Sequence, residues 1–225
     1  MVPHSSTKYV ETMQKLLLYL LFAALAASLS AQETKSIILS QPDTNRGLPV
    51  MKALSLRASA TDYDTTALKL QDLSDLVWAA NGVNRTDAGK RTAPSAMNAQ
   101  DVDVFVIMKS GTYLYDAKKH QLDLVAEGDL RMLAADRQEV VAKAPVICLL
   151  VSDITRFRSG EEASRLVWAA EDAGIVSQNI AVFCAGVGLS TRPRGTMNQQ
   201  KLTEVLKLKP SQHLMLNHPV SYPKR

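Results

Sequence analysis

Residues 91–108, RTAPSAMNAQDVDVFVIM, join a polar loop to an apolar strand, and the fold is best understood from this junction. In the loop, Pro94 fixes φ and lacks a backbone donor, while Ser95 and Asn98 offer side chains to nearby backbone or to a ligand. Residues 102–108 change from alternating to continuous apolar residues, which predicts a strand buried on both faces. A polar loop that leads into a buried strand is a common setting for a binding site, so we expect one here.

Hydrophobic periodicity on either side of this junction predicts both helices and strands. In residues 72–82, apolar side chains at helical spacing form one stripe, with Asp72 suited to cap the helix and Gly82 to end it. Residues 111–127 form two strand-like runs around a central turn, which predicts a hairpin. Further helices are expected over residues 48–57, 129–142 and 198–208, and further strands over residues 144–151 and 213–219.

The longest expected helix runs from Ser159 to about Val187. Ser159 is a suitable first residue, and two glutamates that follow it suit the positive end of the helix dipole. An alanine-rich core helix in a monomer and a helix at a subunit interface are both consistent with its composition. Its small residues, which allow another backbone to approach closely, are Ala163, Ala169, Ala170, Ala173, Gly174, Ala181, Ala185 and Gly186.

The N-terminal residues are typical of an export signal. Residues 13–31 have a basic start, an apolar run and a small-residue end, which predicts a signal peptide over residues 1–31, with Met13 as an alternative start. The apolar run is shorter than the roughly 20 residues of a membrane span, so we expect no stable span after signal removal. An uncleaved N-terminal anchor is the alternative. We therefore expect a periplasmic or secreted protein in which residues 32–47 form a flexible leader.

The composition indicates one globular domain. The chain has 225 residues, 46% hydrophobic and 21% charged, and no linker rich in Pro, Gly or Ser divides residues 48–225. The net charge of +4 comes from scattered basic residues, so nucleic-acid binding is not expected. Cys148 and Cys184 lie in apolar surroundings and are expected to be buried, and no residue spacing predicts a metal site. The sequence also lacks G-x-S-x-G, H-E-x-x-H and Walker motifs.

Five short motifs, in the expected order, resemble those of one protein family. Residues 94–100 resemble its P-S-x-x-N-x-Q loop, and residues 57–59 resemble its R-x-S motif. The other three segments are residues 76–85 (LVWAANGVNR), residues 172–179 with the pattern D-x-G-x-x-x-Q-N, and the turn at residues 188–195. On these residues the chain resembles the nitroreductase-like FMN flavoproteins, and more closely their branch of thiazoline and oxazoline oxidases.

This resemblance implies a fold and a chemistry. The implied fold is α+β, with helices flanking a central, mainly antiparallel sheet and the long helix at a homodimer interface. The implied activity is that of an FMN-dependent oxidoreductase, in which the flavin carries the hydride chemistry and no protein nucleophile is required. A donor would reduce FMN at N5, and a nitro compound, a quinone or a related small molecule would then take the electrons. The donor stays open, because nicotinamide cofactors are chiefly cytosolic and export is expected.

The resemblance also assigns residues to the flavin site. Arg57 is expected to bind the phosphate through its forked guanidinium, and Ser59 to add a hydroxyl donor. Pro94, Ser95 and Asn98 are expected to contact the isoalloxazine ring from the partner subunit. The remaining expected site residues are Gln100 in an orienting role, the amide of Gln138, the backbone of Gly188, Leu189 and Gly195, and the basic group of Lys224.

Two positions depart from the family pattern. Thr61 stands where many members have a second basic residue, and Ser221 stands where the branch often has glycine. These departures favour an alternative, a non-catalytic flavin-binding or degenerate scaffold protein. A further alternative is an azoline oxidase that acts on modified peptides, which would need a biosynthetic partner. The basic residues that would compensate for Thr61 are Arg85, Arg91, Lys224 and Arg225.

Overall fold

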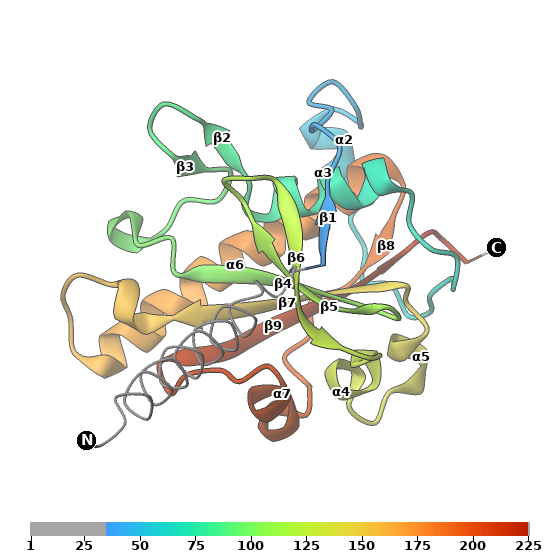
Figure 1. Cartoon of the computed structure of the whole chain (residues 1–225). Coiled ribbons are helices and arrows are strands. Elements are labelled where there is room, and N and C mark those ends of the chain that lie inside the picture. Colours follow the sequence, from blue (N-terminus) through green and yellow to red (C-terminus); the bar gives the residue numbers. More distant parts are fainter. Residues whose placement is uncertain (1–34, 225) are drawn as a thin grey trace, which may run out of the picture. The chain divides into compact units, whose positions relative to one another are not determined.

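A seven-stranded sheet forms the centre of the protein in the computed structural model, which describes residues 35–224 (Figure 1). The strand order is β1-β6-β5-β4-β7-β9-β8, and each neighbouring pair is antiparallel. This confirms the expected α+β fold. The strands are β1 (Ser36–Ile38), β4 (Val102–Met108), β5 (Gly111–Asp116), β6 (Gln121–Glu127), β7 (Val146–Asp153), β8 (Ser190–Thr191) and β9 (Gln212–Ser221).

The strands in the middle of the sheet, β4 and β7, are buried on both faces, as their continuous apolar sequences predict. Val106 of β4 lies opposite Cys148 of β7, and Ile107 lies opposite Ile147. Val106 and Cys148 belong to the apolar cluster on one face, while Ile107 and Ile147 belong to the cluster on the other. Two apolar faces require helices on both sides of the sheet.

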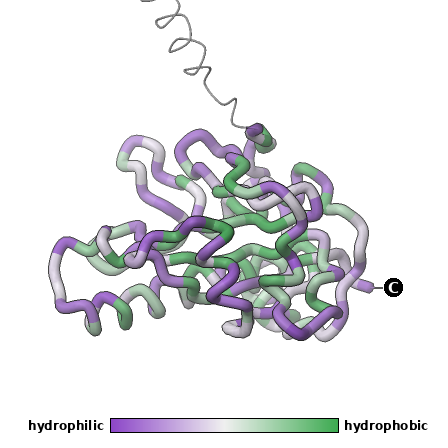
Figure 2. The backbone as a smooth tube through the Cα atoms, turned by 60° about the horizontal axis from the view of Figure 1, so that its bottom comes forward, coloured by the Kyte–Doolittle hydropathy of each residue, from purple (hydrophilic) through white to green (hydrophobic). Residues whose placement is uncertain are grey.

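Helices cover both faces accordingly. On the face that contains Val106 lie α3 (Leu70–Asn81) and α6 (Glu162–Val187), and α2 (Val50–Leu56) packs on α6. On the other face lie α4 (Arg131–Ala135), α5 (Glu139–Ala142) and α7 (Gln199–Val205), at the bottom of Figure 1. Apolar segments run through the interior and hydrophilic ones follow the outer turns (Figure 2). Among residues 35–224, none of the helices has the length and apolar character that a membrane span requires.

Four smaller elements lie around the junction that the sequence singles out. The strands β2 (Val83–Arg85) and β3 (Lys90–Arg91) form a separate hairpin just before the loop. The 3-10 helix η1 (Ala96–Asn98) lies within the loop itself, and a second, η2 (Ile154–Arg156), follows β7. The predicted hairpin over residues 111–127 is present as β5 and β6.

The ends of two predicted helices differ from the sequence patterns. The helix α6 ends at Val187 as predicted, but it begins at Glu162 because Gly160 has a φ of 96°, which no helix includes. Ser159 therefore caps nothing, and its hydroxyl donates to the sulfur of Met97 at 3.5 Å. Residues 129–142, predicted to be mostly helical, form two short helices, α4 and α5, because the chain turns at Asp136 with a φ of 56°.

The start of α3 also differs, because Asp72 has another role. The predicted apolar stripe is buried and Gly82 is the C-cap, but the N-cap is Lys69. The Asp72 carboxylate, in the first turn, accepts hydrogen bonds from Arg46 and from the Tyr222 hydroxyl, each at 2.6 Å. A position that looked like a local cap thus joins α3 to segments far away in the sequence.

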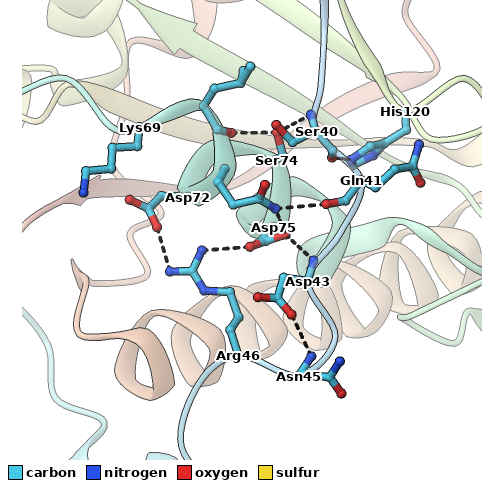
Figure 3. Close-up of polar contacts among 12 residues, drawn as sticks. Ser40, Gln41, Asp43, Asn45, Arg46, Lys69, Asp72, Ser74, Asp75 and His120 are labelled. Atoms are coloured by element: carbon cyan, nitrogen blue, oxygen red, sulfur yellow. Dashed lines mark hydrogen bonds and ion pairs between the residues drawn. The ribbon is translucent and has the colours of Figure 1, made fainter.

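Residues 35–47 are attached to α3 and to the sheet, where we had expected a flexible leader (Figure 3). The strand β1 pairs with β6, and Ser40 N–H donates to the hydroxyl of Ser74 at 2.9 Å. The Arg46 guanidinium donates to Asp75 at 2.8 Å as well as to Asp72. The leader prediction was therefore wrong from β1 onward. Residues 32–34 of that leader and the predicted signal peptide lie outside the described residues.

Candidate functional site

Arg57 and Ser59 lie just after α2, where the chain leaves the helix. Arg57 is the C-cap, and its N–H donates to the carbonyl oxygen of Ala53 at 2.9 Å. The side chains of Arg57 and Ser59 are exposed, and neither makes a hydrogen bond or an ion pair with any described residue. A guanidinium and a hydroxyl without protein partners, two residues apart, are available to an anion.

A cavity of about 180 Å³ lies beside this pair, between residues 56–60 and the C-terminal part of α6. The Ala60 N–H donates to the carbonyl oxygen of Thr191 at 2.9 Å, which holds the two segments together. Gly188, with a φ of 75°, turns the chain at the end of α6 so that the predicted turn lines the cavity. The Leu189 side chain is buried, so it lines the cavity floor instead of projecting into solvent. This arrangement places Ser59 and Leu189 on one cavity, and Gly188 is the residue before Leu189 in the chain.

Arg192 is a cation next to this cavity that the sequence reasoning missed. One of its Nη atoms donates to the side-chain oxygen of Gln138 at 2.6 Å, which brings Gln138 to the turn. Burial raises the pKa of Tyr63 to about 12, and the nearby charge of Arg192 acts in the opposite direction. Arg192 therefore lies near Tyr63, whose hydroxyl donates to the carbonyl oxygen of Ala60 at 3.3 Å. The missing basic residue at position 61 was the signal that another cation was needed nearby.

Gly195 of the predicted site and its neighbour Arg194 have different surroundings. Gly195 is exposed, and a Cβ atom there would meet no atom within 4 Å, so its backbone is accessible. The neighbouring Arg194 is buried, and its guanidinium donates to the carbonyl oxygens of Ala134 and Ala135 at 3.0 and 3.1 Å. Arg194 therefore holds the turn in place and is not available to a ligand.

Lys224 lies close to the segment after Ser59 but is already paired. Its ammonium group donates to the Asp62 carboxylate, and this hydrogen bond lowers the pKa of Asp62. The C-terminal residues before it are attached to the same segment, because the Ser221 hydroxyl accepts a hydrogen bond from Asp64 N–H at 3.2 Å. Of the other basic residues proposed to compensate for Thr61, Arg225 lies outside the described residues.

The loop of residues 94–100 lies elsewhere on α6. The Ala96 N–H donates to both carboxylate oxygens of Asp172, at 3.0 and 2.9 Å. The Ser95 hydroxyl accepts from Gln100 N–H at 2.8 Å, and the Gln100 side chain bonds to Arg91 at 3.0 Å. Ser95 and Gln100 thus build the loop.

Asn98 differs from its neighbours in this loop. It is exposed with a φ of 53°, and its side chain has no hydrogen-bond partner among the described residues. A strained, exposed amide without a protein partner is suited to contact a ligand.

The two parts of the predicted site are far apart within one chain. Asp172, which holds the loop, and Cys184, which lines the cavity, are separated along α6 by about 18 Å at 1.5 Å per residue. A cavity of about 180 Å³ is also smaller than a typical small-molecule site of roughly 300–1,000 Å³. In a single copy of the chain, the residues of the predicted site therefore lie in two separate places.

The fold and these motifs together identify the family. The sequence profile of the nitroreductase family matches residues 54–222, which is most of the chain and includes all five motifs. The chain belongs to the nitroreductase family. It is thus an oxidoreductase-family protein with the fold that its sequence motifs predict.

Individual members of the nitroreductase family support this assignment. A crystal structure from Ralstonia eutropha, named as a nitroreductase, is 32% identical and has a TM-score of 0.79, covering 88% of this chain and 93% of that one. A Methanocaldococcus jannaschii protein named as a nitroreductase is 27% identical over 164 residues, which are 68% of this chain and 81% of that protein. A Desulfovibrio desulfuricans structure in complex with FMN has a TM-score of 0.58 at 20% identity, covering 79% of this chain and 88% of that one.

Two larger cavities contain none of the predicted site residues. One, of about 430 Å³, lies between the start of α3, the β4–β5 turn and α5, and is lined by Leu73, Ser110 and Lys143 among others. The other, of about 480 Å³, lies beside the β2–β3 hairpin and is lined by Trp78 and His120 among others. The assignment of the candidate site therefore rests on its free polar side chains and not on cavity size. Within residues 35–224, no group of three or more His, Cys, Asp or Glu side chains is arranged to hold a metal ion.

Proposed function

We propose that this chain is an FMN-dependent oxidoreductase whose flavin phosphate binds at Arg57 and Ser59. The observation that carries the proposal is the pair of exposed, unpartnered side chains beside the cavity between α2 and the end of α6. The FMN complex from Desulfovibrio desulfuricans, a protein of the same fold, supports the choice of cofactor. When bound, FMN supplies the hydride and electron transfer, and the protein supplies position and electrostatics.

The residues around the cavity fit the chemical parts of FMN. The phosphate matches the Arg57 fork, which can make two charge-assisted hydrogen bonds, and the Ser59 hydroxyl can add a third. Arg192 supplies positive charge in the place of the basic residue absent at Thr61, although it also holds Gln138. The open backbone at Gly195 allows a flat ring to approach closely.

We further propose that two copies of the chain complete each site. Asn98 would come from the partner subunit, because in its own chain it lies too far along α6 to reach the cavity. The exposed apolar side chains of α2 and α6 are suited to be covered by the partner. These side chains are Val50, Met51, Leu54 and Leu56 on α2, and Val167 and Ile175 on α6.

The finer assignments rest on the sequence alone. The motif at residues 76–85 supports the branch of thiazoline and oxazoline oxidases, and residues 13–31 support export to the periplasm or beyond. We propose a nitro compound, a quinone or a related small molecule as acceptor. The electron donor is to be identified by anaerobic reduction of the bound flavin with candidate donors.

The first experiment is flavin retention by the full-length chain after addition of FMN and dialysis, read from the absorbance spectrum. The Arg57→Ala variant should lose about 2 kcal/mol of phosphate binding, a roughly 30-fold rise in Kd. Lys201→Ala is the matched control, because it also removes one exposed positive charge, on α7 across the sheet. A wild-type chain that stays colourless while folded would reject the FMN proposal and favour the scaffold alternative.

The shared site has its own test, by mixing two defective variants. Asn98→Ala and Arg57→Ala should each bind FMN weakly, but a mixture that exchanges subunits would contain dimers with one intact and one doubly defective site. We expect the mixture to regain tight flavin binding that neither variant shows. If the mixture binds FMN no better than the average of the two variants measured separately, each chain binds flavin alone or not at all.

A further inference from the structure

Two buried carboxyl groups face each other beneath the loop of residues 94–100. Asp101 lies at the end of the loop and is 0% exposed, and Asp172 of α6 is 3% exposed. They are within hydrogen-bonding reach of each other, and both line a cavity of only about 10 Å³. Two ionised carboxylates in this setting would repel each other strongly without water to screen them.

The hydrogen bonds around the pair leave room for one proton. Both oxygens of Asp172 accept from Ala96 N–H, and one oxygen of Asp101 accepts from the Ser152 hydroxyl. The other oxygen of Asp101, Oδ1, is buried and has no donor among the described residues. A proton on the Asp172 carboxyl would supply that missing donor. The cavity is at the lower limit of the volume that one water needs, so a proton is the better partner.

Among the described residues, the nearby arginines are bonded to groups other than the two carboxylates. Arg156 of η2 is a positive group near Asp101, and its guanidinium donates to the Gln100 carbonyl at 2.8 Å and to the Asp103 carboxylate at 2.9 Å. Arg91 lies near Asp103 and Arg156, and Glu171 of α6 adds a further negative charge near Asp172. Burial and the hydrogen bond with Asp101 raise the pKa of Asp172 to about 7, in spite of the opposing bond from Ala96 N–H.

We propose that Asp101 and Asp172 hold one proton between them and that this proton fastens the 94–100 loop to α6, which makes both of them positioning residues for Asn98. The loop then has two attachments to Asp172, one through Ala96 N–H and one through the Asp101 carboxyl. Loss of the proton removes the second attachment and replaces it with repulsion between two buried charges. The consequence for Asn98 as a flavin contact rests on the proposed function, whereas the shared proton does not.

The shared proton is tested through the amide of Ala96, which donates directly to Asp172. In the full chain labelled with ¹⁵N-alanine, the Ala96 amide chemical shift should show an inflection near pH 7, the pKa of Asp172. The inflection should disappear in Asp172→Asn and move to lower pH in Asp101→Asn, because the repelling carboxylate is gone. The control Asp129→Asn, on the other face where Asp129 pairs with Arg131, should keep it. A wild-type shift that stays flat between about pH 5 and 9, or an inflection retained in Asp172→Asn, would overturn the shared proton.

The positioning role is tested separately with FMN. The affinity of the wild-type chain for FMN should fall roughly fivefold between about pH 6 and 8.5, the worth of one hydrogen bond, and should stay constant in Asp172→Asn. An Ala96 inflection without any pH dependence of FMN affinity would reject the positioning role. Failure to bind FMN at any pH would reject both the proposed function and the positioning role. The titration of the Ala96 amide would still show whether Asp101 and Asp172 share a proton.

Discussion

Replacing Arg46 by alanine should loosen residues 35–47 and destabilise the domain. The Arg46 side chain is 24% exposed, and its two partners are more buried, Asp72 at 12% and Asp75 at 3%. A hydrogen bond between charged groups contributes about 1.5–3 kcal/mol, so the two bonds set an upper limit of about 6 kcal/mol. Both carboxylates keep other donors, namely Tyr222 for Asp72 and Gln71 for Asp75. We therefore expect a loss of about 2–3 kcal/mol, or about 4–12 °C in Tm.

The assay is urea unfolding of the full-length wild type and variant at neutral pH. Lys119→Ala is the control, because Lys119 and Asp116 form a 3.7 Å ion pair with side chains 67% and 27% exposed. That exposed pair should contribute less than about 1 kcal/mol. If Arg46→Ala costs no more than Lys119→Ala, residues 35–47 are not held to α3 by this ion pair.

The same ion pair should make the wild type sensitive to acid. Burial raises the pKa of Asp72, but hydrogen bonds from Tyr222 and Arg46 outweigh burial and lower it overall. A lowered pKa in the folded state means that the stabilisation is present above the pKa of the unfolded chain, about 4, and is lost as the pH falls below it. The difference in unfolding free energy between wild type and Arg46→Ala should therefore shrink in acid.

Two further predictions concern the core. His218 is buried between the hydroxyls of Ser177 and Thr191, and burial lowers its pKa to about 3. The neutral ring therefore stabilises the folded state fully above about pH 6.5, the pKa of histidine in the unfolded chain, and this stabilisation is lost as the pH falls toward 3. Urea unfolding from pH 7 to 4 should show a smaller acid slope for His218→Gln, and an unchanged slope would contradict the buried neutral ring. Ile107→Ala should cost about 2–5 kcal/mol in the same assay, because Ile107 is fully buried in β4; a cost below about 1 kcal/mol would mean that the strand is not in the core.

The local patterns that predicted the fold correctly all depend on neighbours in the sequence. The continuous apolar run of β4 occurs only where both faces are covered, so burial of the strand could be inferred without knowing what covers it. The end of α6 was predictable because Gly188 adopts a left-handed φ at no steric cost. Cys148 and Cys184 are buried, as their apolar surroundings predict.

Two of the errors arose where a polar group has a distant partner. Asp72 looked like a helix cap, but the Arg46 and Tyr222 that compete for its carboxylate lie far from it in the sequence. Residues 35–47 looked like a leader because they are polar, yet their backbone and Arg46 bond to α3. The sequence of a polar segment does not by itself show whether the segment is a solvated tail or is bonded to the rest of the domain.

The candidate site shows the same division. The motifs pointed to Arg57, Ser59 and Asn98, whose side chains are free of partners among the described residues, but they did not identify Arg192 as a further cation. The sequence also did not predict that the carboxyl groups of Asp101 and Asp172 lie close together, because each residue alone is an ordinary polar position.

By itself, the sequence determined the family and the antiparallel α+β fold, because motif order and hydrophobic period are local properties of the chain. Only the tertiary structure decided which charged groups are paired, which are free and which face each other, since these depend on distances between residues far apart in sequence. It also separated the Asn98 loop from the Arg57 cavity along α6, a distance that the rise of a continuous helix imposes.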